Sequence, residues 1–591
     1  MLYAVLFDEC TCLDGAPWAL DFCRAGCILF GRHDDGKRAA ALTQERSRTR
    51  ELTALYAGLA LLVAASLGVY WTGNASTPLW DRDEPRFAEA AREMLHSGDF
   101  IVPRFNGAVR FDKPILGYYP MAAGMYLFGG NEFGARFFSG VFGALSIIVM
   151  FFLARRIMGH PRQALLAAAV LATSPVMMVE SKLCTVDALL LFLLLLSFYG
   201  LWRIYEGPCG RGWAALFWAA LALAVLTKGP VALAAVFVPA AIAAVAVRDR
   251  SFLRRMGWAW GVPLFLVILA PWLAAVQART GGEFLRVALG RHVVERAQGA
   301  LEGHKGFPGF YVVTLFGTFF PWAFLIPAAV WSAARGLRDK REQVFLIAWA
   351  AGLIIVLELV KTKMVHYSLP IFPALSILVA SLFYPRGARR DAIFKAIVVA
   401  LVLSEAGAAA APVAAYIGGL AGVVVPLVVA GAAAFVGLAF WAFAVERGKG
   451  AGIGVVTVFV WMFLLAAWAA PALGNYALSQ RLAAIVKSAE PAGAVREEPG
   501  AQPSVALYGY EEPSLVFYLG RHVAFPRNPK DAAEIAAPGA PRVLVVSGRE
   551  QKLLSLLESL PREAVTRVGE ARGFNFAKGR HEAVTVWRVG E

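Results

Sequence analysis

Thirteen apolar segments recur along this 591-residue chain, and they constrain its fold more than any other feature. Each has room for about 20 residues, enough for a helix to cross the hydrocarbon core of a membrane. Only 17% of the residues are charged, whereas soluble domains carry about 25%. The pattern predicts an α-helical polytopic membrane protein. The segments begin near Leu52, Phe133, Gln163, Val186, Trp213, Val231, Trp258, Gly309, Gln343, Tyr367, Ala392, Val423 and Gly452.

The basic residues alternate between the loops, and this alternation predicts the orientation of the chain. By the positive-inside rule, the basic loops and the N-terminal tail lie in the cytoplasm. An odd number of spans then places the C-terminus outside. The net charge of +15 would also suit nucleic acid, but its location in membrane loops favours orientation, and we expect no nucleic-acid partner. The basic loops contain Arg155, Arg156, Arg162, Arg203, Arg211, Arg248, Arg250, Arg254, Arg255, Arg335, Arg338, Lys340, Arg341, Arg386, Arg389, Arg390, Arg447 and Lys449.

Changes in composition divide the chain into three predicted parts. Residues 1–51 form a cytoplasmic tail, residues 52–474 a transmembrane domain, and residues 475–591 a small α/β domain outside the membrane. In this last part, the hydrophobic pattern predicts strands over residues 505–510, 542–547 and 583–587. It also predicts a helix over residues 550–560, and no nucleotide-binding glycine motif is present.

Four of the six cysteines lie close together near the N-terminus, where two interpretations compete. Thiolates suit zinc, which would make this segment a metal knuckle. The spacing of Cys10, Cys12, Cys23 and Cys27 matches no familiar zinc pattern, however, and a misassigned start codon would also give such a tail. We favour the second interpretation, because the tail resembles neither a signal peptide nor a span.

The outer loop at residues 71–132 is long for a connector and carries a charged island between apolar segments. Acid and base groups at a membrane border are costly to hold and usually mark chemistry or transport. Residues 84–95 predict an amphipathic helix along the membrane surface, with Glu89 and Glu93 on its solvated face. Residues 115–128 are apolar but short, which indicates a second interfacial segment or a re-entrant one.

Acidic and basic groups from distant loops are expected to converge on the outer face. Carboxylates can activate a nucleophile, and Lys and Arg bind phosphate oxygens. This mixture suits an anionic, phosphate-bearing substrate that enters from the membrane. The outer-face groups are Asp83, Glu84, Arg86, Arg92, Asp112, Lys113, Lys182, Asp187, Lys228, Arg291, His292, Glu295, Arg296, His304, Lys305, Lys361, Lys363, His366 and Tyr367.

Structural roles compete with functional ones for several of these groups. Lysines at helix ends, such as Lys361 and Lys363, commonly extend to the membrane interface. Lys228 lies in a tight hairpin, where anchoring and substrate binding are equally supported. Asp83, Asp112 and Lys113 have the weakest structural explanation, because paired carboxylates beside prolines at a membrane have little structural reason to be there.

Three motifs of the outer loop resemble the aminoarabinose transferases, which are part of the wider protein O-mannosyltransferase-like family in the C-type glycosyltransferase superfamily. They are residues 83–94 (DEPRFAEAAREM), 98–107 (GDFIVPRFNG) and 111–119 (FDKPILGYY). Segments FGGNEFGAR, LTKGP and KTKMVHYSLP, which begin at Phe128, Leu226 and Lys361, continue the match in order. The resemblance covers roughly residues 52–385.

This resemblance implies transfer of a sugar, with inversion, from a polyprenyl monophosphate carrier to lipid A or a protein hydroxyl on the outer face. Asp83 and Glu84 match the family's Asp-Glu pair, with Asp83 as the essential carboxylate and Arg86 in the same motif. Asp112 stands where that family has Glu, and Arg110 where it usually has Tyr. Both changes touch the expected pocket, so aminoarabinose is not assigned as the sugar.

The sequence thus predicts a specific set of site residues and partners. Asp83 and Asp112 are expected to be catalytic. The expected partners are the polyprenyl-phosphate-linked sugar, a lipid or protein acceptor and the lipids of a bacterial inner membrane. No cofactor and no metal ligand is assigned, and a need for a divalent metal stays open. Expected substrate-binding residues are Glu84, Arg86, Lys113, Asp187, Lys228, Arg296, Lys361, Lys363 and Tyr367.

Two other classes of protein would also place charges among spans. A transporter or flippase of lipid-linked or anionic substrates needs intramembrane charges, but near the midplane and often in two related halves. Here the charges cluster on one face, and we see no duplicated half. A catalytically inactive scaffold for the outer domain is a third alternative, which the intact Asp83, Glu84 and Lys113 argue against.

Overall fold

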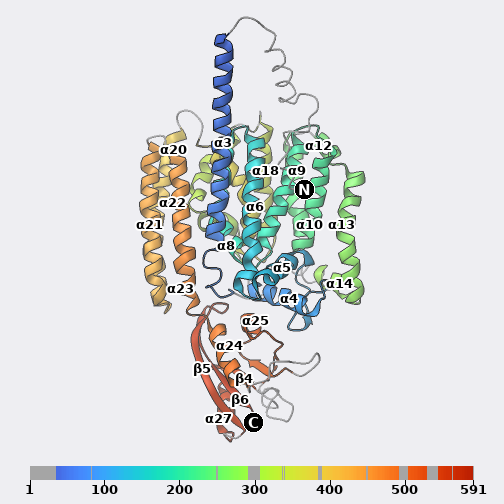
Figure 1. The fold of residues 1–591 in the computed structure, drawn as a ribbon, viewed down its shortest axis with the longest axis vertical. Helices are drawn as coiled ribbons and strands as arrows, with labels where there is room; N and C mark the ends of the chain where they lie inside the picture. Colours follow the sequence, from blue (N-terminus) through green and yellow to red (C-terminus); the bar gives the residue numbers. More distant parts are fainter. Residues whose placement is uncertain are drawn as a thin grey trace.

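A bundle of long helices carries a smaller α/β part at one end (Figure 1). The computed structural model describes residues 35–80, 83–247, 250–289, 306–335, 337, 340–383, 389–446, 450–490, 503–528, 543–561 and 564–589. The four N-terminal cysteines and most of the predicted tail therefore lie outside the described residues.

The prediction of a polytopic membrane protein is confirmed. Within the described residues, eight helices are long and apolar enough to cross a membrane, or nine if one bent pair forms a span. That pair is α7 (Pro161–Ala172) and α8 (Pro175–Lys182), which meet at 62°. The eight are α3 (Asp35–Trp71), α6 (Glu132–Met158), α9 (Asp187–Glu206), α10 (Arg211–Lys228), α13 (Trp258–Arg279), α18 (Arg341–Leu359), α21 (Ala421–Glu446) and α22 (Gly450–Leu464) with its continuation.

The remaining four predicted segments form shorter apolar helices of 10–17 residues. They lie in α11 (Val231–Val247), in η4 and α17 (Trp322–Leu325 and Ile326–Ala334), in η5 and α19 (Val365–Ile371 and Phe372–Ala380), and in α20 (Arg389–Ile417). Short helices α12 (Ser251–Arg255), α14 (Glu283–Leu289) and α16 (Phe310–Thr318) connect the longer ones. A π-helical turn, η6 (Leu465–Ala469), and α23 (Ala470–Gly474) continue α22.

Helix α9 lies at the centre of the bundle. Its most apolar 18-residue window is buried throughout, as expected for a helix that is hydrophobic on every side. The Phe198 ring stacks on Trp349 of α18 with 3.7 Å between ring centroids. Gly200 lets α10 approach closely, because a Cβ there would lie 3.0 Å from the Phe217 side chain. Helix α9 is therefore held in place from several sides.

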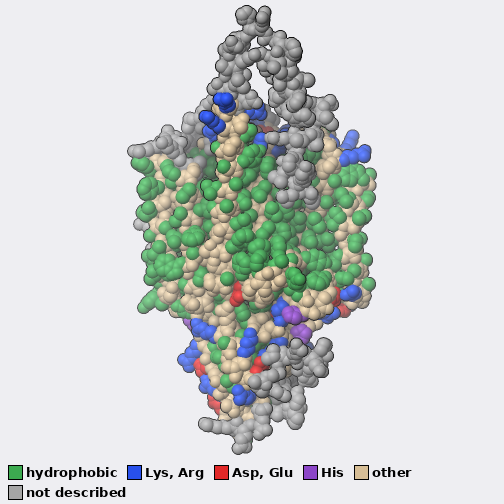
Figure 2. All heavy atoms as spheres, viewed as in Figure 1, with side chains coloured by type: hydrophobic (Ala, Val, Ile, Leu, Met, Phe, Trp, Pro, Cys, Tyr) green, Lys and Arg blue, Asp and Glu red, His purple; other side chains and the backbone are tan. Residues whose placement is uncertain are grey.

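Hydrophobic side chains cover the bundle on the face shown in Figure 2. Lys and Arg gather around its upper end in that view, where α12 and the N-terminal end of α3 lie (Figures 1 and 2). The α/β part at the other end carries mixed charges. The apolar belt between two charged ends is the surface expected of a protein in a bilayer.

The long outer loop folds into a compact layer across the lower end of the bundle (Figure 1). It contains α4 (Asp83–Ser97), the hairpin β1 (Arg104–Phe105) and β2 (Ala108–Val109), η1 (Ile115–Gly117) and α5 (Tyr118–Phe128). The prediction that Glu89 lies on a solvated face is wrong. Its carboxylate is fully buried against Arg92, because α25 covers this side of α4. Burial raises the pKa of Glu89 in spite of that guanidinium.

The C-terminal residues fold into a mixed four-stranded sheet with helices against it. Strand β3 (Val505–Tyr508) pairs in parallel with β4 (Val543–Ser547), and the order is β3-β4-β6-β5. Strands β5 (Val565–Asn575) and β6 (Arg580–Val589) form an antiparallel hairpin. Helices α24 (Leu478–Ala489), α25 (Pro513–Leu519) and α27 (Gln551–Ser559) complete this part. The predicted strands coincide with β3, β4 and β6, whereas β5 was missed.

Specific hydrogen bonds hold the sheet part against the bundle and the outer loop. The Asn106 side chain donates to Val523 O at 2.9 Å and accepts from Val523 N at 2.8 Å. The Tyr518 hydroxyl accepts from Leu79 N at 2.9 Å and donates to Glu132 at 3.0 Å. These bonds place the C-terminal part directly under the loop that carries the predicted site.

Candidate active site

A cavity of about 780 Å³ lies between the outer loop, the lower ends of the helices and the C-terminal part. Its wall is polar on one side and apolar on the other, where Leu427, Leu465 and Leu473 line it. The charged and histidine side chains that line it are Asp83, Glu84, Arg86, Asp112, Lys113, Arg136, Glu180, Lys182, Asp187, Lys228 and His366. Most of the predicted site residues thus meet in one cavity.

Asp83 and Arg86 reach the cavity from the first turn of α4. The apolar face of this helix, with Phe87 and Met94 buried, packs on α5 and fixes the orientation of the first turn. A carboxylate at a helix N-terminus is also stabilised by the helix dipole. The local sequence therefore places Asp83 in the wall of the cavity.

Asp112 and Lys113 reach the cavity from the segment between β2 and η1. Arg110 holds this segment: its guanidinium lies 3.0 Å from Asp112, donates to the Tyr118 hydroxyl at 3.0 Å and lies over the Phe87 ring. Burial lowers the pKa of Arg110, but Tyr118 and Asp112 outweigh it and raise the pKa above its usual value. Arg110 is thus a fixed positive charge beside the site.

Glu84 is bound by protein groups on both of its oxygens. Arg136 donates to Oε1 at 2.6 Å and to Oε2 at 2.7 Å, and both side chains are 2% exposed. The backbone N–H groups of Cys184 and Trp80 also donate to this carboxylate. Glu84 lines the cavity, but its hydrogen-bonding capacity is directed into the protein.

Arg136 also binds three backbone carbonyls that precede α4. It donates to the oxygens of Asn74, Thr77 and Pro78 at 3.0, 2.6 and 2.7 Å. The guanidinium thereby ties the end of the first span to the first turn of α4. In the sequence, Arg136 stands out only as the last residue of the FGGNEFGAR motif; a charged residue near the start of a largely apolar helix is the signal that indicates its role.

A second ionic group lies where α9 and α10 meet. Asp187 at the start of α9 pairs with Lys228 at the end of α10, and the ammonium lies over the Tyr367 ring at 4.6 Å. His366 lies 4.0 Å from Glu180, which accepts a hydrogen bond from Thr185 at 2.7 Å. The structure therefore brings Asp187, Lys228 and Tyr367 together as a group.

Two predicted lysines lie outside the cavity wall. Lys363 is buried against Glu358 and donates to Phe307 O at 3.4 Å, and Lys361 is exposed. The side chains of this segment that line the cavity are Thr362, Met364, His366 and Tyr367. Arg296 falls outside the described residues, as do Arg291, His292, Glu295, His304 and Lys305.

The arrangement can bind an amphiphile with an anionic head. Lys113 and Arg86 offer cationic donors for phosphate oxygens, and Asp83 offers a carboxylate acceptor in the same wall. The apolar side formed by α21, η6 and α23 can accommodate a hydrocarbon chain. The cavity thus combines the two environments that a lipid phosphate requires.

Comparisons with known proteins agree with the motifs quoted above. Residues 55–281 match the dolichyl-phosphate-mannose-protein mannosyltransferase family. The chain is 30% identical over 305 residues to an undecaprenyl phosphate-alpha-4-amino-4-deoxy-L-arabinose arabinosyl transferase of Edwardsiella ictaluri, which covers 51% of this chain and 55% of that protein. A second such enzyme, the arabinosyl transferase 1 of Pseudomonas fluorescens, is 32% identical over 331 residues. This match covers 55% of this chain and 59% of that protein. The match thus spans little more than half the length of these relatives, and it confirms the resemblance.

The fold is also that of a solved structure. The crystal structure of ArnT from Cupriavidus metallidurans bound to undecaprenyl phosphate superimposes with a TM-score of 0.76 at 23% identity. The superposition covers 89% of this chain and 97% of that protein. The likeness in fold thus extends over most of this chain.

Proposed function

We propose that this chain is an inverting glycosyltransferase that moves a sugar from a polyprenyl-phosphate carrier to a lipid or protein acceptor on the outer face of a bacterial inner membrane. One observation carries the proposal: a single cavity joins Asp83, Asp112, Lys113 and Arg86 to an apolar wall. Its polar side suits the sugar phosphate, and its apolar side suits the prenyl chain. The names of the relatives and the undecaprenyl phosphate bound to the solved ArnT structure support this carrier chemistry.

In the proposed reaction, the acceptor oxygen attacks the anomeric carbon from the side opposite the carrier phosphate. The new C–O bond forms as the bond between that carbon and the phosphate oxygen breaks, and its electron pair leaves on the polyprenyl phosphate. A hydroxyl acceptor gives its proton to Asp83. Lys113 and Arg86 offset the charge that grows on the leaving phosphate.

The other site residues hold these groups in position. Arg110 pairs with Asp112 and so fixes the neighbouring Lys113. Glu84, bound on both oxygens by Arg136, fixes the turn of α4 from which Asp83 projects. If the acceptor is itself a phosphate, it needs no deprotonation, and Asp83 orients it instead.

The proposal includes a definite topology with thirteen spans. The charged cavity lies at the end of the bundle opposite the basic ends of α3 and α12, which the positive-inside rule places in the cytoplasm (Figure 1). The cavity and the C-terminal sheet then face the periplasm. Charges at one end of the bundle favour a transferase over a transporter, which needs its site near the midplane.

The test compares carrier-linked sugars in cells that express the wild type or Asp83→Asn. Removal of a general base lowers the rate by about 100- to 10,000-fold, so we expect one polyprenyl-phosphate sugar to accumulate in the variant. Mass spectrometry of the lipid extract identifies that donor. Glu283→Gln is the matched control, because this exposed carboxylate lies outside the cavity wall.

Each outcome separates the candidate functions. Accumulation in Asp83→Asn alone establishes a transferase and names its sugar. Identical carrier pools, together with no sugar transfer by the wild type, would move the assignment to transport or to a scaffold. Unimpaired transfer by Asp83→Asn would leave the transferase intact but remove Asp83 as its base.

A further inference from the structure

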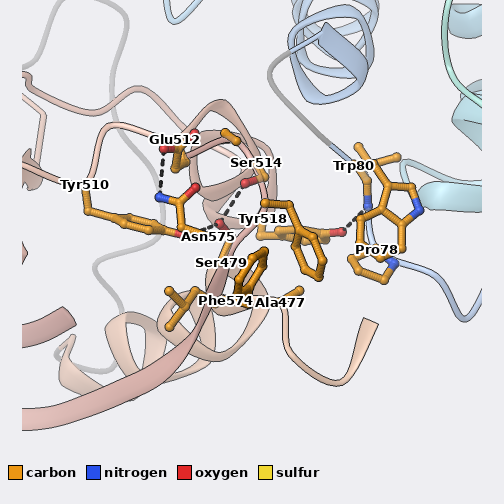
Figure 3. A pocket seen from close by; sticks show the side chains of 14 residues that line it. Pro78, Trp80, Ala477, Ser479, Tyr510, Glu512, Ser514, Tyr518, Phe574 and Asn575 are labelled. Carbon is orange, nitrogen blue, oxygen red and sulfur yellow. Dashed lines mark hydrogen bonds between the residues drawn. The ribbon is translucent and has the colours of Figure 1, made fainter. Parts of the chain in front are cut away.

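A second, smaller cavity lies between the C-terminal part and the segment that precedes α4. Its volume is about 40 Å³, which is room for a few water molecules. Figure 3 shows its polar side chains turned toward one another: Ser479, Tyr510, Glu512, Ser514 and Asn575. Pro78 and Trp80 close it on the side of the bundle.

Three residues belong to the walls of both cavities: Trp80, Phe576 and Ala577. The rings of Trp80 and Phe576 meet edge to face with their centroids 4.8 Å apart. This aromatic pair therefore forms a partition between the small cavity and the large cavity. One ring comes from the outer loop and the other from the C-terminal hairpin, so the C-terminal part supplies a wall of the candidate active site.

Hydrogen bonds hold the two segments that carry the rings of this partition. Phe576 follows directly on Asn575 at the end of β5, and the Asn575 amide donates to Glu512 and Glu582 at 3.0 and 2.9 Å. The backbone of Trp80 donates to Glu84 at 2.7 Å, which connects it to the Arg136 cluster. The partition is thus an organised structure and not a chance contact of two loops.

The two cavities differ in charge. The large cavity is lined by Lys113, Lys228 and Arg86, whereas the described lining of the small one contains no Lys or Arg. Its polar groups are hydroxyls, an amide and the Glu512 carboxylate, which bond to one another, and aromatic rings flank them. A phosphate finds its donors among the cations of the large cavity, whereas the side toward the small cavity offers aromatic rings and no described Lys or Arg.

We propose that Phe576 and Trp80 form the acceptor side of the site, and that Phe576 determines acceptor selectivity. The uncharged, hydroxyl-bearing head of the acceptor packs against this pair from the large cavity, whose wall also carries Asp83. This inference rests on the proposed transfer reaction and adds to it a residue of the C-terminal part. It assigns the carrier phosphate and the acceptor head to different walls.

The first test is independent of catalysis. Ala577→Cys in the full chain, reconstituted in nanodiscs, is labelled with a membrane-impermeant maleimide, and the parent chain gives the background. We expect dodecyl maltoside, an uncharged amphiphile rich in hydroxyls, to slow labelling about tenfold, and dodecyl phosphate to leave the rate within twofold. Adding Phe576→Ala should abolish the protection. No protection by the maltoside, or equal protection by both amphiphiles, would overturn the proposal.

The second test uses transfer kinetics once the donor is known. Phe576→Ala should raise the acceptor KM about tenfold and leave the donor KM within twofold, because its contact lies on the acceptor side. Phe576→Tyr should restore the acceptor KM, since it keeps the ring. Phe525→Ala, an exposed aromatic residue of the same part that lines neither cavity, is the matched control. Equal rises of both KM values would show a structural role and refute acceptor selectivity.

The two proposals fail in distinguishable ways. If the wild type transfers no sugar and shows the same carrier pools as Asp83→Asn, the transferase assignment fails whatever the labelling rate at position 577. If the Asp83 result holds but the maltoside gives no protection and the acceptor KM of Phe576→Ala is unchanged, the transferase stands and the acceptor wall is wrong.

Discussion

The buried ion pair of Glu84 and Arg136 lets a stability measurement distinguish a positioning residue, Glu84, from the neighbouring proposed catalytic residue, Asp83. We expect Glu84→Gln to destabilise the chain, because it leaves the Arg136 side chain, which is 2% exposed, without its counterion. Removal of one partner of a buried ion pair costs about 3–5 kcal/mol. Asp83, one residue earlier, has a half-buried side chain, so Asp83→Asn should lower the free energy of unfolding by about 0.5 kcal/mol or less.

The magnitude follows from what the guanidinium binds. Two of its five hydrogen bonds go to Glu84, and the other three go to the carbonyls of Asn74, Thr77 and Pro78. A glutamine retains an acceptor and the shape of the side chain, so the loss is mainly that of the charge. We therefore place Glu84→Gln near 3 kcal/mol and expect Arg136→Met to reach the upper end of the range.

The assay is the free energy of unfolding of the purified chain, from denaturant titration in mixed micelles. The double variant completes a thermodynamic cycle, in which a coupling energy of about 2 kcal/mol is expected for groups in direct contact. The exposed pair of Arg162 and Glu51, with its atoms 3.0 Å apart, is the control and should contribute no more than about 1 kcal/mol. An unfolding free energy of Glu84→Gln within 1 kcal/mol of the wild type, or additive losses in the cycle, would refute the reasoning.

Two further predictions concern the packing of the outer loop. Gly124→Ala should lower the free energy of unfolding by about 1–3 kcal/mol, because a Cβ there would overlap the carbonyl oxygen of Gly134. Gly130→Ala is the control: the space around this glycine is open, so the variant should be nearly neutral in the same denaturant titration. Asn106→Gly keeps the left-handed backbone, with φ of 53°, and loses only the two hydrogen bonds to Val523. Hydrogen–deuterium exchange at Val523 should become at least about fivefold faster, since each bond contributes about 1 kcal/mol, and an unchanged rate would show that the docking does not depend on it.

Much of the fold was predictable because apolar length is a strong signal. All the long spans coincide with predicted segments, and the strands β3 and β4 follow from short apolar runs. Strand β5 escaped prediction because only a few of its residues are buried and two glycines interrupt it. Its stability comes from pairing with β6, which a local pattern cannot reveal.

The candidate site was predictable in its charges but not in their roles. The sequence placed Asp83, Asp112, Lys113, Asp187 and Lys228 on one face, and the structure brings them to one cavity. Which carboxylate faces the cavity and which faces a guanidinium depends on tertiary contacts. Asp83 lines the cavity, whereas both oxygens of the adjacent Glu84 are bound by Arg136. The two side chains differ in this way because successive helical residues point about 100° apart.

Phe576 shows a different limit of sequence reasoning. It lies far along the chain from the predicted outer loop, in a hairpin whose second half alone was predicted as a strand. A single aromatic residue at a turn has no pattern that connects it to a distant cavity. Only the docking of the C-terminal part shows the connection.

The complete enclosure of helix α9 determines how the bilayer can act on this protein. Since its central window touches protein on every side, a change in hydrocarbon thickness acts on α9 only through its neighbours. Thickness acts directly on peripheral helices such as α13, whose window is 17% buried, and these can adjust by tilting at a cost of fractions of a kcal/mol per Å. Asp187 at the start of α9 is therefore insulated from the lipid, so the geometry around it can stay constant in membranes of different composition.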